Sequence, residues 1–136
     1  ADFAAVAGTF DYVVLAAPLT PATRGMLSRA VLAVMKPTAV VVNVGRGALA
    51  DEAALESALR SGTLAGAALD VFETEPLPGT SGLWELENVL VTPHLSGDAR
   101  KQLPALAEQF ASNLAAWKAG RPLMNVVDKE LGFVVS

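Results

Sequence analysis

The stretch AVVVNVGRGALADEAALESALRSGTLAGAALDV, residues 39–71, decides the fold class of this chain. It holds two short apolar runs, Ala39 to Val44 and Ala65 to Val71, with a helical pattern between them. Nearly continuous hydrophobicity is typical of strands covered on both faces, as in a parallel sheet, rather than of half-exposed antiparallel strands. In the segment between the runs, Asp51 can cap a helix that Gly62 ends. Strand, helix, strand in this order predicts a right-handed unit with parallel strands.

The same alternation extends toward the amino terminus and beyond the third strand. Two further apolar runs, Tyr12 to Ala17 and Asn88 to Thr92, predict two more strands. Between the first two strands, Ser28 can cap a helix that runs to about Met35 and ends at Lys36-Pro37. The whole pattern predicts an α/β protein, a partial, Rossmann-like doubly wound parallel sheet with flanking helices.

The sequence from Glu73 onward predicts a loop, a long helix and a tail in addition to the fourth strand. Glu73 to Glu87 is rich in Pro and Gly and reads as a loop with one tight turn near Leu83 to Leu86. A helix is expected from about 99 to 119, where Pro104 is tolerated only in the first turn. Apolar residues recur in it at spacings of three and four: Leu103, Leu106, Phe110, Leu114 and Trp117.

Composition narrows the function classes. The 136 residues fit one domain with its own core. Ten basic against fourteen acidic residues give a net charge of -4, which argues against a nucleic-acid or anionic membrane surface. No apolar run approaches the roughly 18 residues of a membrane span, and the opening residues do not read as a signal peptide. The absence of Cys excludes thiolate metal sites and is consistent with the cytoplasm, where we expect the protein. No metal site is expected.

Polar residues, together with Pro18 and Gly45, follow the predicted strands. Because ligands of open α/β sheets bind beyond the carboxyl ends of the strands, these residues predict a site at one edge. In strand order they are Pro18 and Thr23, then Asn43, Gly45 and Arg46, then Asp70 and Glu75, and finally His94.

Three of these residues are suited to reducing a 2-oxo acid. His94, the only histidine, can give or take a proton near neutral pH, and a carboxylate such as Glu75 would stabilise the imidazolium. Arg46 offers a fixed fork of donors for a carboxylate and an adjacent carbonyl.

Each residue taken alone also has a purely structural interpretation. A lone histidine after a proline can be a surface residue, Arg46 can pair locally, and Glu75 can be an ordinary loop residue. Asp70 can form a turn. The glycines that flank Arg46, Gly45 and Gly47, can simply provide positive φ.

Three long motifs, in order and at matching spacings, resemble the D-isomer-specific 2-hydroxyacid dehydrogenase family. They are VVNVGRGALADEAAL (Val41 to Leu55), LAGAALDVFETEPLP (Leu64 to Pro78) and NVLVTPHLSG (Asn88 to Gly97), and APLTPATRGM (Ala17 to Met26) resembles the preceding segment. The likeness runs from about Asp11 to Asp128. It implies an NAD(P)-dependent oxidoreductase acting on a small 2-hydroxy or 2-oxo acid, and a homodimer.

The resemblance also implies residue roles. Arg46 would bind the substrate carboxylate and carbonyl, His94 would be the acid/base, and Glu75 would orient and charge His94. Hydride would pass from the nicotinamide to the carbonyl carbon. NAD or NADP would contact Ala17, Pro18, Thr23, Val44, Gly45, Arg46, Asp70, His94 and Gly97, with Asp70 near the nicotinamide carboxamide.

One departure from the family pattern is small and one is large. Ala50 replaces a usual Val, which is a packing change. The glycine-rich unit that holds the pyrophosphate, and the substrate domain, would precede Ala1, so residues 1–136 form only the carboxyl-terminal half of the dinucleotide-binding domain. We expect such a fragment to be inactive alone. Two alternatives stay open: a non-enzymatic, dinucleotide-sensing interaction protein of the same fold, as the co-repressors among the relatives of this family are, and a formate- or phosphite-type dehydrogenase.

Overall fold

The computed structural model describes residues 3–97 and 102–134. The chain divides into two compact units, Ala1–Leu95 and Ser96–Ser136. The first carries the sheet and the second carries the long helix, and each is described by itself.

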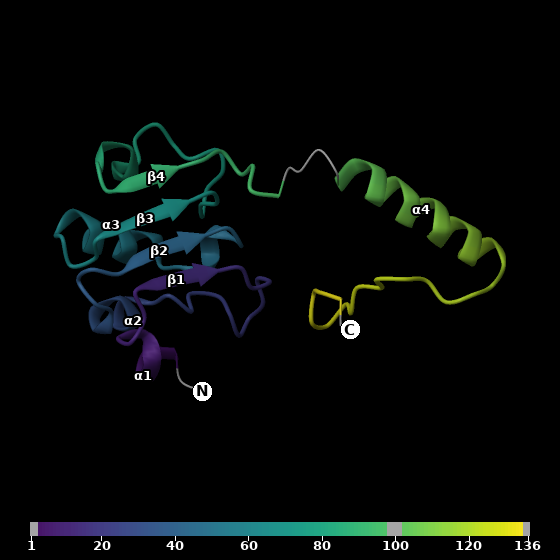
Figure 1. Cartoon of the computed structure of the whole chain (residues 1–136), viewed down its shortest axis with the longest axis horizontal. Coiled ribbons are helices and arrows are strands. Elements are labelled where there is room, and N and C mark those ends of the chain that lie inside the picture. The colour runs from purple at the N-terminus through teal and green to yellow at the C-terminus, as the bar shows by residue number, and fades with distance from the viewer. Residues whose placement is uncertain (1–2, 98–101, 135–136) are drawn as a thin grey trace. The chain divides into compact units, whose positions relative to one another are not determined.

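A four-stranded parallel sheet organises the first unit. Its strands are β1 (Tyr12–Leu15), β2 (Val40–Asn43), β3 (Gly66–Leu69) and β4 (Val89–Val91). They lie in the order β1-β2-β3-β4, and every neighbouring pair is parallel. All four therefore end at the same edge (Figure 1). The predicted α/β class and parallel sheet are confirmed, although each strand is shorter than its apolar run.

Local capping explains the two connecting helices, α2 (Arg29–Val34) and α3 (Glu52–Arg60). The side chain of Ser28 accepts a hydrogen bond from the backbone N–H of Val31 at 3.3 Å. Asp51 accepts one from the N–H of Ala54 at 2.9 Å. Both residues are the predicted caps, and each satisfies an N–H that the helix leaves unpaired.

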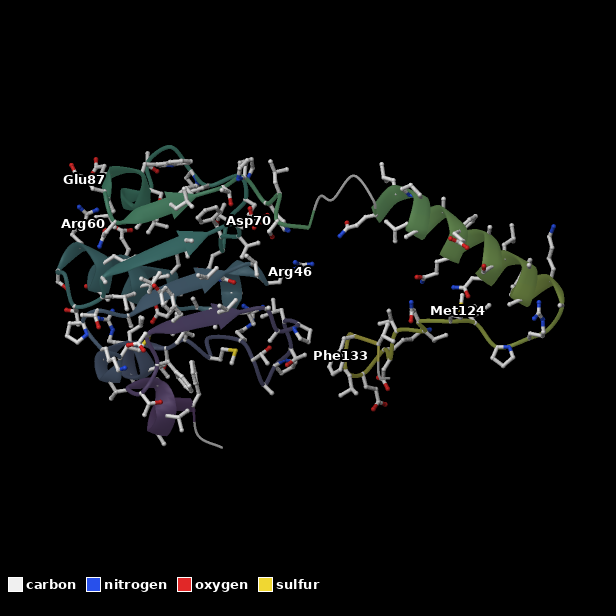
Figure 2. The ribbon with its side chains drawn as sticks, in the orientation of Figure 1. Arg46, Arg60, Asp70, Glu87, Met124 and Phe133 are labelled. Carbon is white, nitrogen blue, oxygen red and sulfur yellow. The ribbon has the colours of Figure 1, made fainter. Side chains whose placement is uncertain are left out.

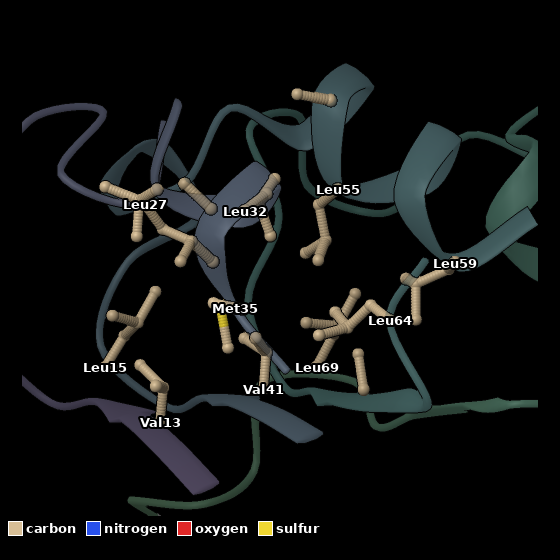
Figure 3. Packing of buried hydrophobic residues seen from close by; sticks show 14 of the residues in the cluster. Val13, Leu15, Leu27, Leu32, Met35, Val41, Leu55, Leu59, Leu64 and Leu69 are labelled. Carbon is tan, nitrogen blue, oxygen red and sulfur yellow. The ribbon is translucent and has the colours of Figure 1, made fainter. Parts of the chain in front are cut away.

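The hydrophobic core lies between the sheet and these helices. Val13, Leu15, Val41 and Leu69 project from the strands toward α2 and α3 (Figure 3). They meet helix residues such as Leu32 and Leu55, which are 3% and 2% exposed. Burying each such side chain stabilises the fold by about 1.5 to 3 kcal/mol, an upper estimate.

The other face of the sheet does not match the expectation that both faces are covered. Tyr12, Val14 and Leu90 are 70%, 59% and 63% exposed. The cause is topological. Successive right-handed crossovers that step in one direction place their helices on the same face, and in the described part of the first unit the chain only steps from β1 toward β4.

Three short elements appear that the sequence pattern did not predict as such. A five-residue helix, α1 (Phe3–Ala7), precedes β1 and buries Ala7 completely. A 3-10 turn, η1 (Gly47–Leu49), links β2 to α3. A second one, η2 (Gly82–Glu85), stands where a tight turn was expected.

The second unit contains α4 (Gln102–Lys118) and a tail. The predicted start near residue 99 lies outside the described residues. Pro104 is in the first described turn, and Gly120 follows the helix with a φ of 65°. The amide side chain of Asn113 ties the tail to α4 through two hydrogen bonds, because it accepts from Met124 N–H at 2.9 Å and donates to Met124 C=O at 3.1 Å. Among the described helices, none is long and apolar enough to cross a membrane.

Candidate active site

Residues that follow β2 and β3 lie beyond the carboxyl edge of the sheet. Figure 2 shows Arg46 and Asp70 at this edge, and Arg60 and Glu87 at the opposite one. The arrangement follows from the parallel register, in which Asn43, Leu69 and Val91 are neighbours at the strand ends.

The imidazole of His94 is paired with the carboxylate of Glu75. Their Nδ1 and Oε2 atoms are 2.7 Å apart, within the range of a charge-assisted hydrogen bond. The second carboxylate oxygen, Oε1, accepts the backbone N–H of Phe72 at 3.0 Å. The bond to His94 is the main cause that lowers the pKa of Glu75 below its ordinary value of 4.5, and the Phe72 N–H adds to it against a small opposing effect of burial. Glu75 therefore stays a carboxylate near neutral pH.

Arg46 is held at the same edge by a buried amide. Asn43, only 2% exposed, donates from Nδ2 to the backbone oxygen of Arg46 at 3.1 Å and accepts the N–H of Gly45 at Oδ1 at 3.2 Å. The exposed guanidinium donates to the carbonyl of Gly45 at 2.7 Å. Its positive charge also contributes to lowering the pKa of Glu75.

The glycines around Arg46 serve close packing, and the interpretation that they provide positive φ is wrong. Neither is among the described glycines with positive φ. A Cβ on Gly47 would lie 1.9 Å from the carbonyl carbon of Phe72, and one on Gly45 would lie 3.2 Å from the carbonyl oxygen of Ala17. The turn after β2 therefore packs directly on the segments that follow β1 and β3.

Asp70 is buried beside the turn that carries His94. Its side chain is 3% exposed. Its Oδ1 accepts the hydroxyl of Thr92 at 2.5 Å and the backbone N–H of Leu95 at 2.9 Å. His94, between these two donors, has a φ of 56°. The structure thus places Asp70 next to the acid/base candidate.

The residues predicted on the cofactor side occupy the loops after β1 and β2. The hydroxyl of Thr23 donates to the carbonyl of Pro18 at 2.7 Å, which closes the loop between them. Val44 is 38% exposed, and its N–H donates to the carbonyl of Leu15 at 3.1 Å. Gly97 falls in the second unit. The cofactor contacts of all these residues stay predictions.

Two polar residues with supporting contacts have no role assigned from the sequence. Asn43 is predicted only to lie at the edge of the site, and Thr92 is only part of a motif. A polar residue within an apolar run is the signal that marks both. His94 and Glu75 also line a cavity of about 340 Å³, whose apolar wall includes Phe72 and Trp84. In the described ranges, no three His, Cys, Asp or Glu side chains gather as a metal site would require.

Comparison of the sequence with known proteins finds one family. Residues 1–96 match the NAD binding domain of D-isomer specific 2-hydroxyacid dehydrogenases. The chain is 45% identical over 121 residues to a glyoxylate reductase of Pyrococcus furiosus, and 42% identical over 121 residues to glyoxylate/hydroxypyruvate reductase B of Serratia proteamaculans. Each alignment covers 89% of this chain. The chain spans only 36% and 37% of those proteins.

Solved structures show the same likeness. A D-isomer specific 2-hydroxyacid dehydrogenase from Xanthobacter autotrophicus, in complex with NADPH and MES, superposes with a TM-score of 0.84 at 46% identity. That match covers 93% of this chain and 51% of the other. An NADPH-dependent glyoxylate/hydroxypyruvate reductase from Sinorhizobium meliloti, in complex with NADP and sulfate, superposes with a TM-score of 0.86 at 40% identity. Here 96% of this chain and 42% of the other are covered.

Proposed function

The chain belongs to the D-isomer specific 2-hydroxyacid dehydrogenase family, and from that premise we propose that it forms part of an enzyme that reduces a small 2-oxo acid with a nicotinamide dinucleotide. The reverse reaction would oxidise the corresponding 2-hydroxy acid. Glyoxylate and hydroxypyruvate are the first substrates to test, because similar proteins are named for their reduction.

The hydrogen-bonded pair of His94 and Glu75 is the observation that carries this proposal. With Nδ1 engaged by the carboxylate, the other ring nitrogen is the one to give a proton to the substrate oxygen. Arg46 would bind the substrate carboxylate through its planar fork and polarise the carbonyl beside it. In the reductive direction the carbonyl carbon gains a hydride and the oxygen gains the proton of the imidazolium, so the product is the 2-hydroxy acid.

We propose NAD or NADP as the hydride donor, and the loops at the carboxyl edge fit such a cofactor. Gly45 packs near Ala17, so the exits of β1 and β2 form one continuous border to the crevice where open α/β sheets bind dinucleotides. Ala17, Pro18 and Thr23 would lie along the ribose side. Toward the nicotinamide the cofactor would contact Val44, Gly45, Arg46, Asp70, His94 and Gly97. When bound, the dinucleotide supplies the hydride.

The remaining parts of the site would come from sequence outside these 136 residues. We propose that a glycine-rich strand-turn-helix unit holds the pyrophosphate and that a separate domain covers the substrate. Each lost charge-assisted hydrogen bond to phosphate removes about 1.5 to 3 kcal/mol of binding free energy. Residues 1–136 alone are therefore expected to bind dinucleotide weakly. Micromolar binding of NAD to this fragment in isothermal titration would contradict the expectation.

We further propose a cytoplasmic homodimer. The absence of Cys is consistent with a reducing compartment, and the family resemblance supports a dimer. Light scattering coupled to size-exclusion chromatography of the complete polypeptide measures the oligomeric state. A monomer at micromolar concentration would count against the dimer.

The proposed activity is tested by following the absorbance that NADH and NADPH lose on oxidation, with glyoxylate, hydroxypyruvate and larger 2-oxo acids as substrates. The complete polypeptide encoded by the gene is used. His94→Asn should lower kcat by a factor of about 10² to 10⁴, the usual contribution of a positioned acid/base. Arg46→Gln should mainly raise KM for the acid. Arg60→Gln is the matched control, because Arg60 lies at the opposite edge of the sheet (Figure 2) and should leave both constants unchanged. Failure of every 2-oxo acid to oxidise either cofactor would refute the proposal.

A further inference from the structure

We propose that Asp70 and Thr92 are positioning residues that hold the turn carrying His94, and so aim its imidazole at the substrate. The inference deepens the proposed function and rests on it for the substrate. Its structural part, that this contact maintains the pair of His94 and Glu75, stands on the geometry of the chain itself.

His94 adopts a backbone conformation that needs support from its surroundings. Its φ of 56° lies in the left-handed region, which side chains other than glycine rarely occupy because Cβ crowds the backbone. Its own N–H donates to the carbonyl of Thr92 at 3.1 Å, across Pro93. Such conformations persist where neighbouring contacts fix them, and they gather at functional sites.

One oxygen of Asp70 supplies contacts on both sides of His94. Oδ1 accepts the hydroxyl of Thr92, two residues before the histidine, and the N–H of Leu95, one residue after it. Thr92 and Leu95, on either side of His94, are thus both hydrogen-bonded to Asp70 Oδ1. A buried carboxylate oxygen holds its donors strongly, because it must recover in hydrogen bonds the hydration that burial removes.

Asp70 and Thr92 are themselves held by backbone hydrogen bonds to the ends of β2 and β3. The N–H of Asp70 donates to the carbonyl of Asn43 at 3.0 Å, and the N–H of Thr92 donates to the carbonyl of Leu69 at 3.0 Å. Asp70 follows directly on β3, a central strand with neighbours on both sides. Because β3 is hydrogen-bonded to a strand on each side, Asp70 and Thr92 link the turn that carries His94 to the sheet as well as to the exposed loop.

The same strand exit also fixes the partner of His94. Phe72, two residues after Asp70, donates its N–H to Glu75 Oε1 at 3.0 Å. The exit of β3 therefore anchors the turn that carries the imidazole through Asp70, and the carboxylate of Glu75 through Phe72. The 2.7 Å contact between Nδ1 and Oε2 requires both anchors, because the two residues are nineteen positions apart.

A merely turn-forming Asp70 would predict a different response to mutation. If Asp70 only formed a local turn, removing the Thr92 hydroxyl would change stability and leave the pairing of His94 with Glu75 intact. If Asp70 and Thr92 aim His94, the same removal would loosen the pairing, lower kcat and leave binding of the dinucleotide unchanged.

The experiment compares Thr92→Val, which removes the hydroxyl at nearly constant shape, with Thr92→Ser, which keeps it. Both are made in the complete polypeptide. Thr63→Val is the control, because Thr63 is exposed and, among the described residues, its hydroxyl has only Ser61 as a hydrogen-bond partner, at 2.8 Å. The kinetic readout is reduction of glyoxylate. Thr92→Val should lower kcat on the order of 100-fold, as expected for a displacement of about 1 Å. KM for the dinucleotide should stay within about twofold, and Thr92→Ser should recover most of the loss.

A second readout does not depend on activity. The carbon-13 carboxyl signal of Glu75, assigned by its disappearance in Glu75→Gln, reports the pKa that the bond to His94 lowers. In Thr92→Val this pKa should rise toward the ordinary value, and in Thr92→Ser and Thr63→Val it should match the wild type. Thr92→Ala provides a second deletion of the hydroxyl if Thr92→Val does not fold.

The outcomes separate the two ideas. An unchanged Glu75 titration in a folded protein without the Thr92 hydroxyl overturns the positioning role, whatever the activity. A shifted titration in a protein that reduces no 2-oxo acid retains the role in holding the pair and refutes the proposed function instead. A kcat that is unchanged in Thr92→Val, in an active enzyme, also overturns the inference.

Discussion

Gly47→Ala is predicted to disturb stability and activity together. An added Cβ would lie 1.9 Å from the carbonyl carbon of Phe72, 2.1 Å from its oxygen and 2.4 Å from the nitrogen of Glu73. All three atoms are backbone, so no side-chain rotation relieves the contact. Ordinary contact begins at 3.4 Å, so the turn after β2 must move away from the exit of β3 by about 1.5 Å.

This displacement acts at a sensitive place. The moving turn carries Arg46, and the segment it presses against carries the N–H of Phe72 that holds Glu75. Overpacking of this kind costs about 1 to 3 kcal/mol of stability. A displacement of about 1 Å at a reacting group lowers kcat/KM on the order of 100-fold.

The assay pairs thermal unfolding with steady-state reduction of glyoxylate by the complete polypeptide. Gly79→Ala is the matched control, because a Cβ at Gly79 meets nothing within 4 Å and its φ is not positive. Gly79→Ala should melt and react like the wild type, whereas Gly47→Ala should melt several degrees lower. If Gly47→Ala melted within a degree of the wild type and kept its kcat/KM, the packing argument for the Arg46 turn would be refuted.

Three further predictions concern a core side chain, a helix cap and the pH dependence of stability. Leu55→Ala should cost about 2 to 5 kcal/mol in urea unfolding, because the side chain is 2% exposed and leaves a cavity; a loss below about 1 kcal/mol would contradict the burial. Ser28→Ala should cost about 1 kcal/mol, whereas Ser28→Asp should retain the cap and its stability. Glu75→Gln should be less stable than the wild type near neutral pH. The lowered pKa of Glu75 contributes stability that is present above pH 4.5 and is lost as the pH falls through the pKa of Glu75 in the folded state. The difference in stability between the wild type and Glu75→Gln should therefore shrink on acidification. If the difference in melting temperature between the wild type and Glu75→Gln grew as the pH was lowered, the predicted direction of this pH dependence would be wrong.

The elements whose signals are local could be predicted closely. The start of α3 at Glu52 follows from the capping side chain of Asp51, and its end follows from Gly62, which has a φ of 72°. The order of strands and helices followed from the apolar runs and the handedness of the crossovers. In contrast, α1 has only five residues and depends on packing against α2, which no local pattern reports.

The sequence predicted the edge of the sheet at which the site lies, but it did not predict the contacts between the site residues. Parallel strands had to bring Arg46, Glu75 and His94 to the same end of the sheet, and the structure has them there. The bond between Glu75 and His94 depends on how the intervening loop returns to β4, which depends on tertiary packing. The same holds for Gly45 and Gly47, since the sequence marks them as special and only the neighbouring backbone shows that space, and not φ, is the reason.

The division between buried and exposed polar residues bears on how this site would respond to mutation. Arg46, Glu75 and His94 are exposed in this chain, so replacing them removes little packing. Asn43 and Asp70 are the buried polar residues of the described core, and each binds the backbone of a turn that carries one of the proposed catalytic groups. Loss of an exposed group should therefore reduce activity with only the modest loss of stability that its own hydrogen bonds contribute, whereas loss of a buried one leaves donors without acceptors and reduces activity and stability strongly. In this site the groups proposed to react are therefore different residues from those that position them. The positioning residues, Asn43 and Asp70, are also part of the packed strand ends, so they contribute to the stability of the sheet.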